Sequence, residues 1–236
     1  MVSTNLDEVR QKIKAACQKA NRNPNEVTLI AVSKTKPIEL IEQAMENSQQ
    51  DFGENKVQEL THKIEILPDN LRWHMIGHLQ RNKVKYIVGK VALIHSVDSL
   101  RLAKEISKEA KKHGVDAEVL IEVNVGEEAS KQGVTCTEAI ALVEDIAKLP
   151  GVLIKGLMTI APFVKDPEEN RGIFRKLKQL GVDIKNKNIN NVSVDVLSMG
   201  MTGDYEVAIE EGATMIRVGT GIFGDRDYAM TTQIGD

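Results

Sequence analysis

Apolar residues follow two alternating patterns along the chain. Short, nearly continuous apolar runs are typical of buried strands, whereas an apolar residue every three or four positions is typical of an amphipathic helix. The chain begins with the second pattern, because Leu6, Val9 and Ile13 recur at helical spacing within residues 4–21. We therefore predict an N-terminal helix that ends before Pro24.

About eight units of a strand followed by a helix come next. Successive strands that run in one direction need crossover helices, so this alternation predicts a parallel sheet. Eight units without a linker or a change in composition close most simply into a (β/α)8 TIM barrel, and a doubly wound open sheet is the alternative. We expect a single α/β domain over residues 1–236, with an extra N-terminal helix. The expected strands are 27–32, 51–52, 73–76, 92–95, 118–125, 153–158, 192–197 and 215–218, and the expected helices include 37–47, 55–66, 137–149, 167–180, a basic helix to about residue 88 and one that ends at His113.

The first expected strand, VTLIAV, leads directly into two lysines. Four of its six residues are β-branched, which is typical of a strand buried on both faces. Lys34 and Lys36 follow at its C-terminal end, where a lysine is partly desolvated. Desolvation lowers the pKa of an ammonium group, so such an amine can act as a nucleophile or form a Schiff base. The alternative is that both lysines are ordinary solvated charges.

The last two units end in segments of small residues. Ser198, Met199 and Gly200 follow the seventh expected strand, and Gly219 and Thr220 follow the eighth. In TIM barrels the loops after these two strands frequently bind phosphate through backbone N–H groups, to which hydroxyl groups can add donors. The alternative is that these segments are simply tight turns.

Arg217 lies inside the last expected strand, in the sequence MIRVG. A barrel interior accommodates an arginine only when another group satisfies its charge and its donors. That group is either a carboxylate from a neighbouring strand or a ring nitrogen of a bound cofactor. Together with a Schiff-base lysine on the first strand and a phosphate site, this arginine fits pyridoxal 5′-phosphate (PLP).

Composition and charge exclude several other classes of function. The net charge is −3 and aromatic residues make up 3% of the chain, which disfavours nucleic acid and anionic membranes as partners. No apolar run reaches the length of a membrane span. Cys17 and Cys136 match no metal or redox spacing, and two lone thiols predict a reducing cytoplasm. One helix face is basic, and we interpret it as a solvated surface: Arg81, Lys83, Lys85 and Lys90.

Eight motifs follow one another along nearly the whole chain: AVSKTKP, FGENKVQE, WHMIGHLQRNK, HSVD, VNVGEEASKQGV, GLMTIAP, LSMGMT and RVGTGIFGDRDY. As a set they resemble those of the pyridoxal phosphate homeostasis protein family, whose barrel is similar to the N-terminal domain of alanine racemase. The resemblance implies that Lys34 carries PLP as a Schiff base and that Lys36 does not. It also implies that Arg217 faces the pyridine nitrogen and that Asn55 lies near the ring.

Several further residues are candidates with two interpretations each. Met158 either packs against the cofactor ring or fills barrel volume. Asn124 either contacts the cofactor or satisfies backbone groups. His74 is expected to be a core or wall histidine. The resemblance places the loops of His78 and Lys131 at the barrel mouth, although a solvated histidine and a solvated charged loop are the simpler interpretations.

We expect a carrier of PLP rather than an enzyme. The sequence ends soon after the eighth unit, so we expect no second domain to cap the barrel and supply a catalytic base. An arginine beside the pyridine nitrogen would weaken the ring as an electron sink. We therefore predict a cytoplasmic monomer that acts in vitamin B6 and amino-acid homeostasis, with PLP and PLP-dependent apo-enzymes as partners and no metal site. The alternatives are a weak PLP-dependent amino-acid racemase or another PLP enzyme of unknown substrate, and an aldolase-type lysine barrel without cofactor.

Overall fold

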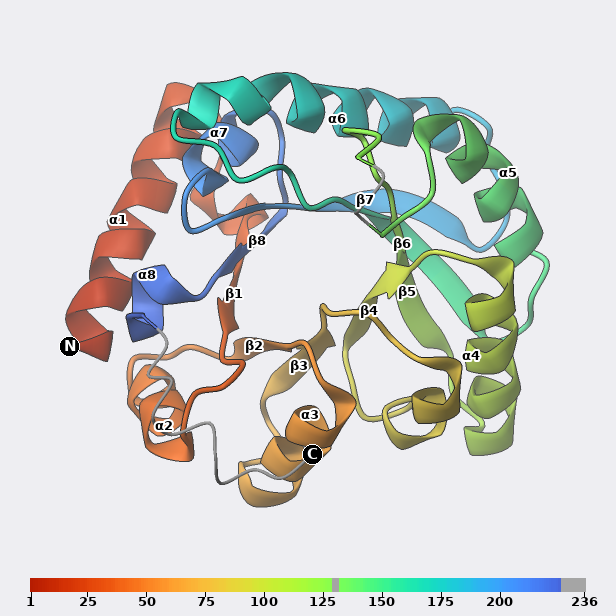
Figure 1. Ribbon diagram of the computed structural model, residues 1–236, viewed down its shortest axis with the longest axis horizontal. Helices are drawn as coiled ribbons and strands as arrows, with labels where there is room; N and C mark the ends of the chain where they lie inside the picture. The colour runs from red at the N-terminus through yellow and green to blue at the C-terminus, as the bar shows by residue number, and fades with distance from the viewer. Residues whose placement is uncertain (129–131, 226–236) are drawn as a thin grey trace.

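Eight parallel strands close into a barrel in the order β1 to β8 (Figure 1). The structure is a computed structural model that describes residues 1–128 and 132–225. The predicted (β/α)8 barrel is thereby confirmed, and the open sheet is excluded. The strands are β1 (Thr28–Val32), β2 (Asp51–Glu54), β3 (Arg72–Met75), β4 (Leu93–Val97), β5 (Ala117–Glu122), β6 (Val152–Met158), β7 (Val192–Met201) and β8 (Met215–Val218).

Helices surround the barrel, and the extra N-terminal helix α1 packs against the last two of them, α7 and α8 (Figure 1). Its buried residues include Leu6, Val9 and Ile13, the stripe that predicted it. Within the described ranges, no helix is long and apolar enough to cross a membrane. The α-helices are α1 (Val2–Lys19), α2 (Ile38–Glu46), α3 (Val57–Ile66), α4 (Leu100–His113), α5 (Cys136–Ile146), α6 (Arg171–Lys185), α7 (Tyr205–Glu210) and α8 (Thr220–Phe223), and the 3-10 helices are η1 (Pro24–Glu26), η2 (Arg81–Tyr86) and η3 (Pro167–Asn170).

Several boundaries differ from the prediction, and two of these differences change the type of structure expected for a segment. The basic segment forms the short 3-10 helix η2, which ends at Tyr86. Strand β7 continues to Met201, so Ser198, Met199 and Gly200 lie in a strand and not in a loop. The backbone of Gly200 has φ +92°, and a side chain there would come within 2.6 Å of the Cβ atom of Ala208 in α7. A glycine is therefore required for the close packing of α7, and it does not mark a turn.

The barrel interior is divided between an apolar and a polar part. Leu93, Leu120 and Met158 form a buried apolar cluster, on which Val196 and Met215 pack. The polar part consists of buried side chains from β2, β3, β4, β7 and β8. This polar part leads toward the C-terminal ends of the strands, where the candidate site lies.

Candidate functional site

A pocket of about 490 Å³ opens at the C-terminal ends of the strands. It has the position expected for the site of a TIM barrel. Its walls come from β1, from the segment after β6, from the end of β7 with the turn that follows, and from β8 with the start of α8. The lining residues are Val32, Lys34, Lys36, Ile160, Ala161, Pro162, Phe163, Val164, Asn170, Met201, Thr202, Gly203, Asp204, Arg217, Gly219 and Thr220.

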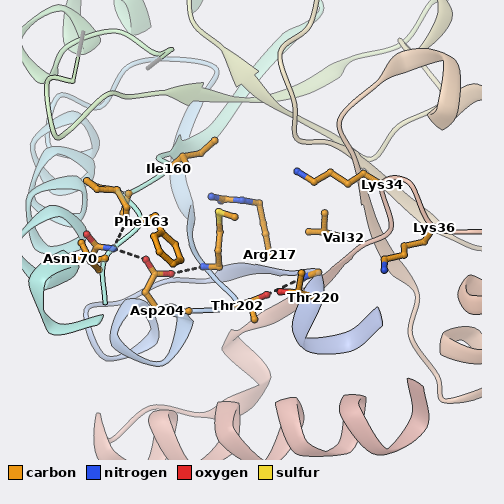
Figure 2. A pocket seen from close by; sticks show the side chains of 16 residues that line it. Val32, Lys34, Lys36, Ile160, Phe163, Asn170, Thr202, Asp204, Arg217 and Thr220 are labelled. Atoms are coloured by element: carbon orange, nitrogen blue, oxygen red, sulfur yellow. Dashed lines mark hydrogen bonds between the residues drawn. The ribbon is translucent and has the colours of Figure 1, made fainter. Parts of the chain in front are cut away.

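The two lysines after β1 point in different directions (Figure 2). The amine of Lys34 extends into the pocket toward Arg217. The amine of Lys36 turns toward α8, where it donates hydrogen bonds to the carbonyl oxygens of Phe223 and Gly224 at 3.2 and 2.9 Å. Lys36 thus ties the end of α8 to the first strand, and Lys34 presents its amine to the cavity.

Ser33, the residue before Lys34, is held from behind by a buried ion pair. Its hydroxyl donates to the Oε1 atom of Glu54 at 2.6 Å, and its carbonyl oxygen accepts from the ammonium group of Lys63 at 2.8 Å. Lys63 also lies 2.7 Å from Glu54, and both side chains are almost completely buried. Burial raises the pKa of Glu54 to about 7, although the positive charge of Lys63 acts in the opposite direction.

Thr35, the residue after Lys34, is held by the same group of charges. Its backbone N–H donates to the Oε1 atom of Glu59 at 2.6 Å, and Lys63 bonds the same oxygen at 2.7 Å. Thr35 has φ +61°, a left-handed conformation that a threonine rarely adopts without such support. The spacing of Glu59 and Lys63 on one helix was the one sequence signal for this group; Glu54 offered none.

Arg217, from the last strand, also lines the pocket. It is buried, and its guanidinium donates to the Ser198 hydroxyl at 2.6 Å and to the Thr159 carbonyl oxygen at 2.9 Å. Burial lowers the pKa of Arg217 to about 10, against the opposite effect of Asp204 and Glu122. In the described ranges no carboxylate lies within ion-pair distance of the guanidinium, so this structure does not contain the ion pair considered as an alternative.

Only some of the residues that the sequence predicts to bind phosphate line this pocket. Gly219 and Thr220 line the pocket, but the other three residues do not. The hydroxyl of Ser198 is fully buried, accepts from Arg217 and is bonded to His95, so its expected role as a phosphate donor is corrected. Met199 faces the outer core, and Gly200 packs against α7. Sequence reasoning took these small residues for a loop because it ended β7 four residues too early.

Thr202 and Asp204, which sequence reasoning missed, shape this wall of the pocket. The Oγ1 atom of Thr202 accepts hydrogen bonds from the backbone N–H groups of Gly219 and Gly221 at 3.3 and 3.4 Å. Asp204 accepts from the backbone N–H of Met201 at 2.7 Å, and its other oxygen accepts from Asn170 (Figure 2). The Met-Thr-Gly sequence after Gly200 was the available signal, and these contacts join the ends of β7 and β8.

The remaining candidates lie in different places. Met158 is fully buried in the apolar cluster of the barrel interior. Asn124 satisfies backbone groups of its own loop, donating to the carbonyl oxygen of Glu128 at 2.8 Å and accepting from its N–H at 3.2 Å. Asn55 directly follows β2, with its backbone against Gly77, and His78 is exposed. Lys131 lies outside the described residues, and no group of acidic, histidine or cysteine side chains among the described ones is suited to a metal ion.

Comparisons with known proteins agree with this architecture. The family model of the alanine racemase N-terminal domain matches residues 4–227. The pyridoxal phosphate homeostasis protein of Aquifex aeolicus (strain VF5) is 48% identical over 224 residues, which cover 94% of this chain and 97% of that protein. Among solved structures, an unknown protein from Bifidobacterium adolescentis has a TM-score of 0.90 at 36% identity, over 94% of both chains. PipY of Synechococcus elongatus PCC7942, solved with PLP bound, has a TM-score of 0.82 at 33% identity and is covered completely by 95% of this chain.

Proposed function

Because the chain belongs to the alanine racemase N-terminal domain family, and within it to the pyridoxal phosphate homeostasis proteins, we propose that it binds PLP as a Schiff base on Lys34. We propose that it acts in the intracellular homeostasis of vitamin B6 and amino acids, not in catalysis. The observation that carries this proposal is the convergence of Lys34 and Arg217, from the first and last strands, on one pocket (Figure 2).

The residues of the pocket fit the three functional groups of PLP. The Lys34 amine suits the aldehyde, and the guanidinium of Arg217 suits the pyridine nitrogen as a hydrogen-bond donor. Gly219 directly precedes α8 and Thr220 begins it. Backbone N–H groups at this point suit a phosphate, and Thr202 adjoins them. When bound, PLP supplies an electrophilic aldehyde and an electron-withdrawing ring. The proposed contact of Asn55 with the ring rests on the resemblance and on its place directly after β2. The proposed contact of Met158 rests on its place in the barrel interior alone.

Two features support a carrier over a catalyst. Burial leaves the pKa of Arg217 at about 10, so its guanidinium stays charged at neutral pH and would donate to the pyridine nitrogen. A ring whose nitrogen accepts a hydrogen bond without being protonated is a weaker electron sink. The pocket rim is also open to water, since Phe163 is 99% exposed. We further propose one domain over residues 1–236, a monomer, a cytoplasmic location in keeping with two free cysteines, and PLP-dependent apo-enzymes as recipients.

Covalent labelling of two lysine variants tests the attachment site. The protein, Lys34→Ala and Lys36→Ala are each incubated with PLP, reduced with borohydride and weighed by mass spectrometry. We expect the PLP mass on the unchanged protein and on Lys36→Ala, and its loss from Lys34→Ala, with all three melting as folded proteins. Labelling that persists in Lys34→Ala and disappears in Lys36→Ala would place the Schiff base on Lys36 and contradict the proposal.

Absorbance spectra taken with amino acids test the carrier role. We expect a Schiff-base band that persists when excess D- or L-amino acids are added, with neither inversion nor consumption of the amino acid by chiral chromatography. Turnover of any one amino acid would make the protein an enzyme. A protein with no band after incubation with PLP would contradict the cofactor assignment altogether and favour a lysine barrel without a chromophore.

A further inference from the structure

A chain of hydrogen-bonded side chains crosses the barrel interior and ends at Arg217. Asp51 bonds the Nε2 atom of His74 at 3.1 Å, and the Nδ1 atom of His74 lies 3.0 Å from the Nε2 atom of His95. The Nδ1 atom of His95 lies 2.9 Å from the hydroxyl of Ser198, which accepts from Arg217 at 2.6 Å. All five residues are less than 10% exposed, which confirms that His74 is a core histidine.

The two ends of this chain carry opposite charges. Asp51 is the first residue of β2, where Arg72 donates to it from the surface side at 2.8 Å. Burial raises the pKa of Asp51, but the hydrogen bonds from His74 and Arg72 outweigh burial, so its pKa lies below the ordinary value and the carboxylate is ionised. Arg217, at the pocket end, is a cation. The side chains between them therefore lie between an anion and a cation.

These charges fix the direction of every hydrogen bond in between. An arginine only donates and an ionised carboxylate only accepts. Ser198 therefore accepts from Arg217, and His74 donates to Asp51 from Nε2. With a neutral His95, each ring nitrogen finds a partner in one way: the Ser198 hydroxyl donates to Nδ1 of His95, and Nε2–H of His95 donates to Nδ1 of His74.

The surroundings of His95 keep its ring neutral. Burial lowers the pKa of His95 well below its ordinary value, and the positive charge of Arg217 acts in the same direction. A proton on Nδ1 of His95 would also displace the hydroxyl proton of Ser198, for which the described part of the chain offers no other acceptor. An unpaired buried donor is costly, so geometry and charge favour the same tautomer.

We propose that His95 is a positioning residue for Arg217, acting through Ser198. The lone pair of the Ser198 hydroxyl stays directed at one guanidinium nitrogen because the hydroxyl donates its hydrogen bond to Nδ1 of His95. The Thr159 carbonyl oxygen holds the second nitrogen, so the plane of the guanidinium is fixed and its remaining N–H groups are left for the pocket. This inference rests on the proposed function, because it assigns those N–H groups to the pyridine nitrogen of PLP.

Histidine tautomers measured without PLP test the chain itself. Long-range ¹H–¹⁵N correlation spectra distinguish Nε2–H, Nδ1–H and doubly protonated rings, and His95→Gln and His74→Gln assign two of the five histidines of the sequence. At neutral pH we expect both rings to be neutral and protonated at Nε2. A ring of His95 protonated at Nδ1 would overturn the proposal, whether or not the protein binds PLP.

Spectra with PLP test the effect on the pocket. In Ser198→Ala and His95→Leu we expect a shifted absorbance maximum and PLP affinity weaker by about tenfold, the size expected when a hydrogen bond to a charged group is lost. His95→Gln retains an acceptor and a donor, so it should lie closer to the unchanged protein. Leu93→Val is the matched control, because Leu93 lies two residues before His95 in β4 and belongs to the apolar cluster.

The variants separate positioning from general destabilisation. Ser198→Ala with unchanged affinity and absorbance maximum would overturn the proposal, as would Leu93→Val with an equal shift. Should His95→Leu fail to fold, Ser198→Ala carries the test, since it removes a single oxygen atom. An unchanged protein that shows no PLP band would contradict the proposed function, and the tautomers would still decide the direction of the chain.

Discussion

The lysine side and the arginine side of the pocket are held in opposite ways. Beneath Lys34, full charges act on the backbone: Lys63, between Glu54 and Glu59, bonds the carbonyl oxygen of Ser33. Beneath Arg217, neutral groups act on a side chain, because a hydroxyl and a backbone carbonyl accept from the guanidinium. A reactive amine is thus placed by fixing the turn that carries it, and a buried cation is placed by orienting its own donors.

The difference suits what each group is expected to bind. A carboxylate bound directly to Arg217 would satisfy its charge and compete with a ligand for its donors. Neutral acceptors hold the guanidinium without that competition, at the cost of leaving a charge partly uncompensated in the barrel. The charges near Lys34 compensate one another behind the turn, so they fix the backbone without adding a carboxylate to the lining of the pocket.

Removing the central charge on the lysine side should have the largest effect. Lys63→Met keeps an apolar stem of similar length but leaves Glu54 and Glu59 without their cation. Because breaking a buried ion pair leaves an uncompensated buried charge, we expect a loss of about 3–5 kcal/mol in the free energy of unfolding. Urea denaturation measures it.

Lys108→Met is the matched control for this prediction. Lys108 also pairs with a glutamate at 3.0 Å, but on the exposed face of α4, where solvent screens the pair. We expect its unfolding free energy to remain near that of the unchanged protein. Equal losses in the two variants would show that the buried charges do not hold the lysine side.

A pH titration of stability should reveal an uncompensated carboxyl on the arginine side. Burial, helped by Asp98, raises the pKa of Glu122 from 4.5 to about 7, and Arg217 only partly opposes the shift. The folded protein then holds this proton more tightly than the unfolded chain does. The stabilisation is complete below pH 4.5 and is lost as the pH rises through about 7, by up to about 3 kcal/mol.

Glu122→Gln should flatten this part of the stability curve. Glu54 adds a pH dependence of the same sign to the free energy of unfolding. The test is therefore the difference in unfolding free energy between the protein and the variant from pH 5 to pH 8. We expect the variant to be the more stable of the two above pH 7, by chemical denaturation at each pH. Parallel curves would mean that Glu122 is ionised throughout this range and that nearby groups compensate its negative charge more fully than the contacts of the arginine side indicate.

The fold and the two central residues could be predicted because their signals are local. The apolar run before Lys34 and the stripe of α1 each specify one element, and Gly114 ends α4 in the left-handed conformation, as its place after His113 indicates. Parallel strands bring their C-terminal ends to one face, so Lys34 and Arg217 could be placed together although they are far apart in the sequence.

The supporting contacts could not be predicted, because they depend on register. Ser198 and His95 are 103 residues apart, and nothing near either of them indicates the other. Alternate residues of a strand face opposite sides, so ending β7 too early hid the fact that Ser198 faces the interior and Met199 the outer core. The same uncertainty concealed Glu54, whose partner Lys63 lies on the following helix.

Among the variants of the groups that support the pocket, a Thr202 variant should show the smallest change in stability. The hydroxyl of Thr202 accepts two long hydrogen bonds, from Gly219 and Gly221, in a half-buried position, so Thr202→Val should cost less than about 1 kcal/mol of stability. Those bonds join β7 to the proposed phosphate site. We therefore expect the free energy of PLP binding, measured by absorbance titration, to weaken by more than the free energy of unfolding does. Thr202→Ser, which keeps the hydroxyl, should restore PLP affinity. If Thr202→Val binds PLP as tightly as the unchanged protein, then neutral support is needed only around a buried charge such as Arg217, and the loop after β8 keeps its shape through α8 alone.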